Sequence, residues 1–228
     1  MKYSILLFDI DGTLLDFRYS EFMALKKLLS NKNININKHK YNLYHQIGQN
    51  LWAQFEKGEL TKQQQLFNTF KLFFKKLNKK VDVKKAITEY RHFLKNSHSI
   101  IPMADAKKTL IFLKKQNKKL YIASNGITKV QHRRLEEAGL AKFFNQEFVS
   151  ENLGFAKPNP KFFIKIAKEI PLFSKNKALM IGDSLSTDIL GAYRFKIDSA
   201  WLNIDSQIDY SPIKPTYQLF SLFNLTKL

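Results

Sequence analysis

The hydrophobic pattern of the chain begins with a short apolar run that ends in acidic residues. Residues 4–8 are Ser-Ile-Leu-Leu-Phe, and Asp9-Ile10-Asp11-Gly12-Thr13 follow. An apolar run of this length, bounded by a turn signal, predicts a buried strand. Residues two apart on a strand point to the same side, so Asp9 and Asp11 would leave the strand together until Gly12 turns the chain away.

The pattern changes to helical periodicity between residue 17 and about residue 100. Apolar side chains recur at intervals of three and four residues, most clearly over 22–29 and 66–77. This spacing predicts amphipathic helices. Polar breaks over 31–37 and 78–80 separate the periodic segments. We therefore expect a bundle of roughly four or five helices in this part of the chain.

Beyond Pro102, amphipathic helices alternate with short apolar strands. Gly139 and Asn159-Pro160 are typical of a helix end and a helix start. The tail after Ser206, which contains Pro212 and Pro215, is expected to pack on the edge of the sheet. The expected order is a helix over 105–116, a strand over 119–123, a helix over 128–138, a weaker strand over 147–149, a helix from 159 that Pro171 closes, a strand over 178–181, a helix over 186–195 and a strand over 199–202.

This alternation predicts the class of fold. Strands that alternate with helices favour a parallel sheet with right-handed crossovers. We expect an α/β fold, in which a doubly wound, Rossmann-like parallel sheet is interrupted after its first strand by an all-helical insert. The predicted core domain covers residues 1–16 and 101–228, and the predicted insert covers residues 17–100.

Polar residues follow several predicted strands, at the edge where such a sheet binds its ligands. The carboxyl ends of parallel strands meet at one edge, so these residues are expected to form one site. They are Asp9 and Asp11 after the first strand, Ser124 and Asn125 after the second, Lys157 between the third strand and its helix, Asp183 after the fourth, and Asp188 one helical turn later.

The residue types at this edge are typical of phosphoryl chemistry. Carboxylates that lie close together repel one another unless a cation intervenes, so Asp9 and Asp183 are predicted to hold Mg²⁺, which prefers oxygen ligands. An aspartate can also attack phosphorus and form an aspartyl-phosphate. Asp11 would then act as general acid and base.

The remaining polar groups at the edge are expected to bind the phosphate. Lys157 offers a positive charge, Ser124 a hydroxyl group, and the amides around Asn125 and Gly126 open toward a helix N-terminus that favours anions. Each of these motifs alone has a plain structural interpretation, as a loop, a helix start or a cap. Their joint occurrence at the ends of the predicted strands favours the functional interpretation.

Composition limits the alternatives. The chain has 228 residues, no cysteine and a formal net charge of +19. The absence of cysteine excludes disulfides, thiolate metal sites and cysteine nucleophiles. The positive charge invites a nucleic-acid-binding interpretation, but only five of the 38 basic residues are arginine. Lysines spread along many helices are more typical of solvated faces than of nucleic-acid readout, so no dedicated nucleic-acid binding is expected.

The sequence also gives predictions about the location of the protein and about the role of its histidines. The N-terminus has neither the pattern of a signal peptide nor that of a membrane span, so a cytoplasmic protein is expected and no membrane association. The histidines show no spacing typical of metal ligands and are expected to lie on the surface or on helix faces. They are His39, His45, His92, His98 and His132.

The edge motifs resemble those of the haloacid dehalogenase superfamily of aspartate-nucleophile hydrolases. The four motifs of that superfamily correspond to residues 9–13, Ser124-Asn125, Lys157, and Gly182-Asp183 with Asp188. The resemblance covers nearly the whole chain, and the helical insert is similar to the C1 cap of the superfamily. Dehalogenase members lack the second aspartate of the first motif. Since Asp11 is present here, the resemblance implies a phosphatase.

The resemblance also implies a role for each acidic residue. Asp9 would be the nucleophile, and Asp11 the general acid and base whose backbone carbonyl also binds Mg²⁺. Asp183 would be the other metal ligand, and Asp188 would support the water molecules around the metal.

Within the superfamily, the sequence resembles the pyrimidine 5′-nucleotidases, which remove phosphate from nucleoside monophosphates. The resemblance leads us to expect an Arg-Phe pair in the cap, but the sequence has Thr69-Phe70 there. If that arginine contacts substrate, the specificity of this protein would differ. Tyr44, Trp52 and Phe55 could stack on a base, although aromatic residues at helical spacing are more often core residues. The similar segments are 124–128 with Gln131, Arg134 and Leu135, then 154–158, 180–185 with Asp188-Ile189, and in the cap Leu51-Trp52, Glu56, Gly58 and Leu60-Thr61.

The sequence thus predicts a Mg²⁺-dependent phosphatase of small phosphate monoesters, most of all nucleoside 5′-monophosphates with a pyrimidine base. Discrimination between substrates would come from the cap, because the core motifs contact only the phosphoryl group. Fold and core motifs do not fix the substrate, so a sugar-phosphate phosphatase or a phosphomutase is the alternative. A basic nucleic-acid-binding module is the alternative from another class.

Overall fold

The computed structural model describes residues 2–56, 59–95, 100–204, 206 and 212–228. The chain divides into two compact units, Met1–Phe17 with Ile100–Leu228 and Arg18–Ser99. We call the first the core unit and the second the helical unit, and describe each by itself. That the helical unit is a domain over residues 17–100 which covers the substrate stays a prediction.

The core unit is built on a six-stranded sheet in the order β3-β2-β1-β4-β5-β6. Every pairing between neighbouring strands is parallel, which confirms the predicted sheet. The strands are β1 (Ile5–Phe8), β2 (Lys119–Ser124), β3 (Gln146–Val149), β4 (Ala178–Gly182), β5 (Asp198–Leu202) and β6 (Tyr217–Leu219).

Strand β1 lies at the centre of the sheet, where the order of the strands reverses. Phe8 is in register with Ile122 of β2 on one side and with Ile181 of β4 on the other. From this level β2 continues to Ser124 and β4 to Gly182, so the three strands end close to one another. This reversal is the place where doubly wound sheets bind ligands.

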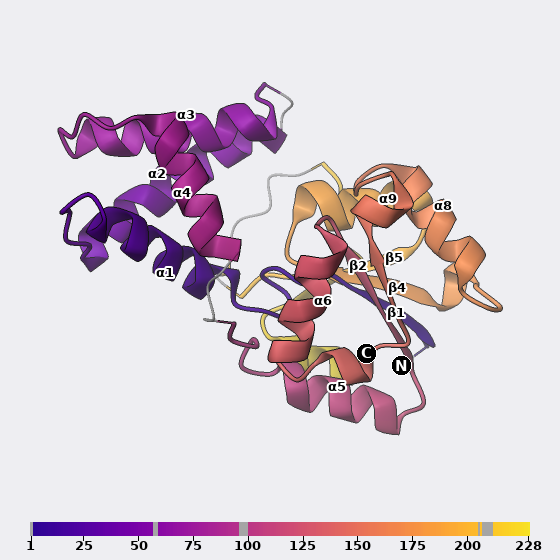
Figure 1. Ribbon diagram of the computed structural model, residues 1–228. Helices are drawn as coiled ribbons and strands as arrows, with labels where there is room; N and C mark the ends of the chain where they lie inside the picture. Colours follow the sequence, from indigo (N-terminus) through magenta and orange to yellow (C-terminus); the bar gives the residue numbers. More distant parts are fainter. Residues whose placement is uncertain (1, 57–58, 96–99, 205, 207–211) are drawn as a thin grey trace. The chain divides into compact units, whose positions relative to one another are not determined.

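Helices cover both faces of the sheet (Figure 1). On β1, Leu6 and Phe8 belong to the core cluster beside α5 (Ala106–Lys115) and α6 (Thr128–Glu137), whereas Ile5 and Leu7 belong to the cluster beside α8 (Pro160–Glu169) and α9 (Leu190–Phe195). Successive residues of a strand point to opposite faces, so a strand between two helical layers must be apolar throughout.

Three local features differ from the sequence prediction or sharpen it. A short helix, α7 (Ser150–Leu153), lies where a loop was expected. The helix predicted over 186–195 begins with a π-helical turn, Leu185–Ile189, before α9. The tail packs on the sheet edge as predicted, and there it forms β6 and a final 3₁₀ helix, Leu222–Lys227.

The helical unit contains four α-helices in its described part, which confirms the predicted bundle. They are α1 (Phe17–Ser30), α2 (Lys38–Glu56), α3 (Lys62–Lys76) and α4 (Val83–Lys95). Tyr44 of α2 is buried against Phe70 and Phe73, with ring centroids 5.5 and 5.3 Å away. For Tyr44 the core interpretation is therefore confirmed. Gly58, one of the residues similar to the nucleotidases, lies outside the described residues.

Among the described residues, none of the helices has the length and apolar character needed to cross a membrane.

A polar cluster fastens the tail strand to the start of the chain. The buried Tyr3 hydroxyl donates a hydrogen bond to Oδ2 of Asp198 at 2.6 Å and lies 3.1 Å from the hydroxyl of Tyr217. Lys2 pairs with the same carboxylate at 3.0 Å. The hydrogen bond from Tyr3, followed by the smaller effect of Lys2, holds the pKa of Asp198 below its ordinary value.

We expect Tyr3→Phe to lower the free energy of unfolding by about 1 kcal/mol at pH 7. This is the usual effect of losing one hydrogen bond to a carboxylate that, like that of Asp198, is partly exposed to solvent. A carboxyl whose pKa is lowered in the folded state stabilises the fold above its unfolded pKa, and that stability is lost as pH falls through the folded pKa. The difference between the two proteins should therefore narrow below about pH 4.

Urea denaturation at several pH values measures this difference. Tyr193→Phe is the matched control, because Tyr193 is exposed. A difference for Tyr3→Phe that does not change with pH would contradict the role given to Asp198.

Candidate active site

Asp9 and Asp11 follow β1 directly, as the sequence predicted. Gly12 has a φ of +82°, and a Cβ atom built there would lie 2.1 Å from Oδ2 of Asp183. A side chain at position 12 would thus be strained and would collide with a carboxylate from β4. The glycine lets the end of β1 turn while the Asp183 side chain closes over it.

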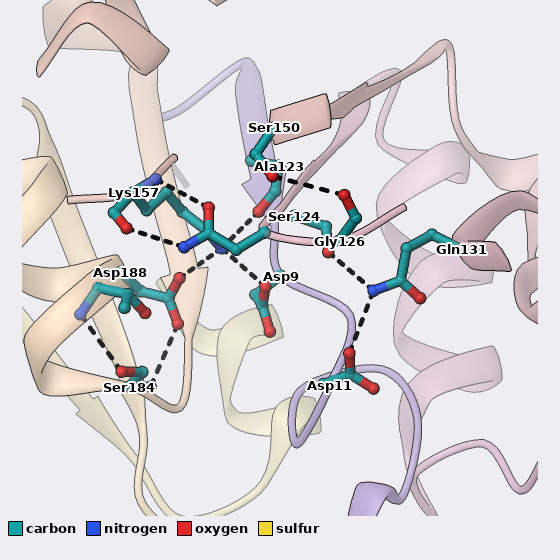
Figure 2. A network of polar contacts seen from close by, with 12 residues as sticks. Asp9, Asp11, Ala123, Ser124, Gly126, Gln131, Ser150, Lys157, Ser184 and Asp188 are labelled. Atoms are coloured by element: carbon teal, nitrogen blue, oxygen red, sulfur yellow. Dashed lines mark hydrogen bonds and ion pairs between the residues drawn. The ribbon is translucent and has the colours of Figure 1, made fainter. Parts of the chain in front are cut away.

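The buried ammonium group of Lys157 connects the ends of β1 and β2 with the π-helical turn after β4 (Figure 2). Its Nζ donates to Oδ1 of Asp9 at 2.7 Å, to Oδ1 of Asp188 at 2.6 Å and to the backbone carbonyl of Ala123 at 2.5 Å. All three hydrogens of the ammonium group are used. Lys157 is therefore fixed in place beside Asp9.

Burial and charge act in opposite directions on this pair. Burial alone would lower the pKa of the Lys157 ammonium group, but the carboxylates of Asp188 and Asp9 raise the pKa overall. The net effect raises the pKa of Asp9 to about 7, because burial and then the charges of Asp188 and Asp11 raise it by more than Lys157 lowers it. The single lysine does not balance the acidic groups around it.

Asp183 and Asp188 come from the end of β4 and the π-helical turn after it. A Cβ at Gly182 would lie 2.1 Å from Oδ2 of Asp188, so only glycine leaves room for that buried carboxylate. Oδ2 of Asp188 accepts a hydrogen bond from the backbone amide of Ser184 at 3.1 Å. The indole nitrogen of Trp201 on β5 donates to the backbone carbonyl of Asp183 at 2.9 Å.

Asn125 holds the backbone of Lys157. Its side-chain oxygen accepts from the Lys157 amide, and its side-chain nitrogen donates to the Lys157 carbonyl, both at 2.8 Å. The side chain keeps at most one amide hydrogen for a ligand. Asn125 thus fixes the loop that carries Lys157, a structural contact that its motif alone did not predict.

The carboxylate of Asp11 is held by two side chains from α6. Arg134 lies 2.6 Å from Oδ1, and Nε2 of Gln131 donates to Oδ2 at 3.1 Å. The same Nε2 donates to the hydroxyl of the buried Ser124 at 3.0 Å. In the sequence, Gln131 and Arg134 entered only through a resemblance. Their spacing of three residues on a helix after the second strand was the signal for a shared face.

The acidic residues at this edge fit a divalent cation. Carboxylate oxygens of Asp9, Asp183 and Asp188 all lie within 4.8 Å of one another. Lys157 is the cation that contacts this group, through Asp9 and Asp188, so three carboxylates face one ammonium group. Two negative charges remain unbalanced, which one divalent metal would cancel. Oxygen-only donors suit Mg²⁺.

This acidic group is the sole candidate of its kind in the described part of the chain, and it contains no histidine. His98 lies outside the described residues. His132, on α6, is exposed and pairs with Glu147 at 3.0 Å.

Comparison with known proteins identifies the family. A family model described as haloacid dehalogenase-like hydrolase matches residues 3–195. The chain belongs to this family of hydrolases. The match includes Asp9, Asp11, Lys157, Asp183 and Asp188.

Relatives that match this haloacid dehalogenase-like hydrolase over nearly its whole length are described either as a HAD-hydrolase or as pyrimidine 5′-nucleotidases. HAD-hydrolase YfnB of Bacillus subtilis is 37% identical over 98% of this chain and 94% of its own length. Pyrimidine 5′-nucleotidase PynA of Streptococcus pneumoniae is 36% identical over 99% and 94%. Pyrimidine 5′-nucleotidase YjjG of Escherichia coli is 28% identical over 100% and 98%. The family and these relatives indicate that the chain is a phosphoric monoester hydrolase.

A solved structure agrees with the fold of the whole chain. The crystal structure of YfnB bound to magnesium has a TM-score of 0.89 at 35% sequence identity, and the match covers 100% of this chain and 98% of that one. The predicted superfamily and the predicted Rossmann-like fold are both confirmed.

Proposed function

We propose that this protein is a Mg²⁺-dependent phosphatase that forms an aspartyl-phosphate on Asp9, and that its substrates are nucleoside 5′-monophosphates with a pyrimidine base. The observation that carries the proposal is the buried Lys157, which bonds to Asp9 and Asp188 beside the unbalanced carboxylates at the carboxyl edge of the sheet. Such a site attracts both a divalent cation and a phosphoryl group.

In the first half of the proposed reaction, Asp9 attacks the phosphorus atom. Lys157 holds Oδ1 of Asp9, so the second carboxylate oxygen can form the new bond to phosphorus. The bond from phosphorus to the ester oxygen breaks, and that oxygen takes a proton from Asp11. The nucleoside leaves as an alcohol.

In the second half, water attacks the aspartyl-phosphate. Asp11 now accepts a proton from that water, the bond from phosphorus to Asp9 breaks, and inorganic phosphate leaves. The same residue serves as acid and then as base, which returns the site to its starting state.

The other edge residues would bind and hold the groups that react. The Ser124 hydroxyl and the backbone amides around Asn125 and Gly126 would donate to the phosphoryl oxygens. Asp9, Asp183 and the backbone carbonyl of Asp11 would hold Mg²⁺, and Asp188 would support its water ligands. Mg²⁺ supplies positive charge that draws the phosphoryl group to the carboxylates.

The relatives that match nearly the whole chain support the proposed substrate class. PynA and YjjG are described as pyrimidine 5′-nucleotidases, and both match nearly the whole chain. A sugar-phosphate phosphatase is the second candidate, because the glyceraldehyde 3-phosphate phosphatase of Methanopyrus kandleri is 36% identical, although over only 41% of this chain. The part that the helical unit plays in choosing the substrate stays a prediction.

We expect kcat/KM for UMP and dTMP to exceed that for sugar phosphates of similar charge by at least about tenfold, because a base stacked on an aromatic side chain contributes about 1–3 kcal/mol. Phosphate release from UMP, dTMP, AMP, glucose 6-phosphate and glyceraldehyde 3-phosphate at one ionic strength measures the order. A sugar phosphate ahead of every nucleotide would overturn the nucleotidase proposal but not the phosphatase one.

Two controls support this comparison. An Asp9→Asn preparation made in the same way shows how much of any release comes from contaminating phosphatases. Addition of a sugar bisphosphate tests for a phosphomutase, which would need such an activator and would return the phosphoryl group to the sugar.

A further inference from the structure

Gln131 lies between two residues to which the proposed reaction gives separate tasks. Its Nε2 donates to Oδ2 of Asp11 at 3.1 Å and to Oγ of Ser124 at 3.0 Å (Figure 2). Its Oε1 accepts from Arg134 at 2.8 Å, and Arg134 also pairs with Asp11. Asp11, Gln131 and Arg134 therefore form a closed ring of polar contacts.

The orientation of the Gln131 amide follows from its partners. An arginine side chain can only donate hydrogen bonds, so the Gln131 oxygen must face Arg134. The amide nitrogen must then face Asp11 and Ser124. Since Gln131 is the donor to the Ser124 oxygen, the hydroxyl hydrogen of Ser124 points elsewhere and can be donated to a phosphoryl oxygen.

The surroundings of Gln131 keep this arrangement rigid. Only 3% of its surface is exposed. A Cβ atom at Gly126 would lie 2.7 Å from Nε2 of Gln131, so the backbone of the loop after β2 packs directly on the amide group. A buried side chain with every polar atom bonded has little freedom to turn.

We propose that Gln131 is a positioning residue which, held by Arg134, aligns the Asp11 carboxyl with the leaving oxygen and the Ser124 hydroxyl with the phosphoryl group. This inference rests on the proposed function. Gln131 acts through Asp11 and Ser124 in this scheme and is not a catalytic residue, because the proposed reaction gives it no contact with phosphorus, the leaving oxygen or the attacking water.

A positioning role through Asp11 has a consequence that a merely structural role lacks. The acid is needed when the leaving oxygen is a poor leaving group, such as the 5′ oxygen of UMP. It matters far less for p-nitrophenyl phosphate, whose leaving group departs without a proton. Because kcat/KM reports events up to the first irreversible step, the ratio of kcat/KM for the two esters isolates this effect.

The test compares the wild-type protein with Gln131→Met, which keeps the length of the side chain and removes its donor and acceptor. We expect kcat/KM for UMP to fall by about 10- to 100-fold, the usual result of a misplaced catalytic group, and kcat/KM for p-nitrophenyl phosphate to fall by a clearly smaller factor. The inhibition constant for inorganic phosphate should rise as well, since Ser124 loses its alignment.

Two further variants complete the design. Gln116→Met makes the same chemical change at an exposed position of the core unit and should alter neither ratio nor inhibition constant. Gln131→Asn keeps the amide on a side chain shorter by one methylene group, and it replaces Gln131→Met if thermal unfolding shows that the latter does not fold. It is expected to change the ratio in the same direction.

The outcomes separate this inference from the function on which it rests. Equal losses on the two esters, or none, in a folded Gln131 variant of an active enzyme would overturn the positioning role alone. A wild-type protein that releases phosphate from no ester would instead overturn the proposed function, and the inference with it.

Discussion

Replacing Asp9 with asparagine is expected to lower phosphate release by at least about 10⁴-fold, the scale on which an enzyme loses activity when its nucleophile is removed. Asp9 is the carboxylate that Lys157 holds at the end of the central strand. An amide cannot form the acyl phosphate that the proposed mechanism requires. Steady-state phosphate release from UMP, or from whichever ester proves best, gives the measurement.

The same substitution should leave the fold intact. Burial raises the pKa of Asp9, so the folded protein does not favour its ionised form, and a neutral amide of similar shape should not lower the melting temperature. Lys157 keeps its bonds to Asp188 and to Ala123. An inactive variant with an unchanged melting temperature would place the defect in the chemistry.

Asp105→Asn is the matched control. Asp105 pairs with Lys108 on the surface of the core unit at 2.8 Å, and such exposed pairs contribute little. Its activity should remain that of the wild type. If Asp9→Asn kept more than about 1% of the wild-type activity, far more than usually remains when a nucleophile is lost, Asp9 would not be the nucleophile.

Removal of divalent metal is the second change for which we expect a complete loss of turnover. Asp9, Asp183 and Asp188 bring oxygen ligands within 4.8 Å of one another, and Lys157 balances only one of their three negative charges. After dialysis against EDTA, phosphate release should be absent, and Mg²⁺ should restore it. Sodium chloride at the same ionic strength should not, because a general salt effect cannot replace a coordinated ion.

Metal binding can also be followed without catalysis. The chain has two tryptophans, Trp52 and Trp201. In a Trp52→Phe background, Trp201 remains, and its indole bonds to the backbone of Asp183 at 2.9 Å. Titration with Mg²⁺ should change the Trp201 fluorescence to saturation and raise the melting temperature, because an ion that binds only the folded state stabilises it. Full activity in excess chelator would contradict the assignment.

Much of the fold followed from the sequence for a physical reason. A strand between two helical layers must be apolar on both faces, and a helix over a sheet must be apolar at intervals of three and four residues, so both leave a clear local pattern. The pattern of 4–8 predicted β1, and that of 66–77 predicted α3. Parallel pairing then brings the ends of β1, β2 and β4 to one edge. That rule predicted which residues would gather there.

The tertiary structure alone decided which of those residues touch. Lys157 bonds to Asp9 across 148 positions of sequence, and Gln131 bonds to Asp11 across 120. No local periodicity specifies such pairs, because they depend on how far each loop reaches and which way each side chain turns. The sequence predicted that the amides around Asn125 bind the phosphate, but it gave no sign that the Asn125 side chain holds the Lys157 backbone.

The same limit explains the role of the glycines and of the α6 residues. Gly182 in the sequence marks only the end of a strand, whereas the structure shows that a Cβ there would collide with Asp188. In the sequence, Arg134 and Gln131 were part of a resemblance without a role of their own. The structure shows that α6 brings both side chains into contact with Asp11. The sequence by itself determined the fold, the family and the chemical types at the site. The close packing of side chains from distant segments decided their partners, because packing is a property of the assembled core.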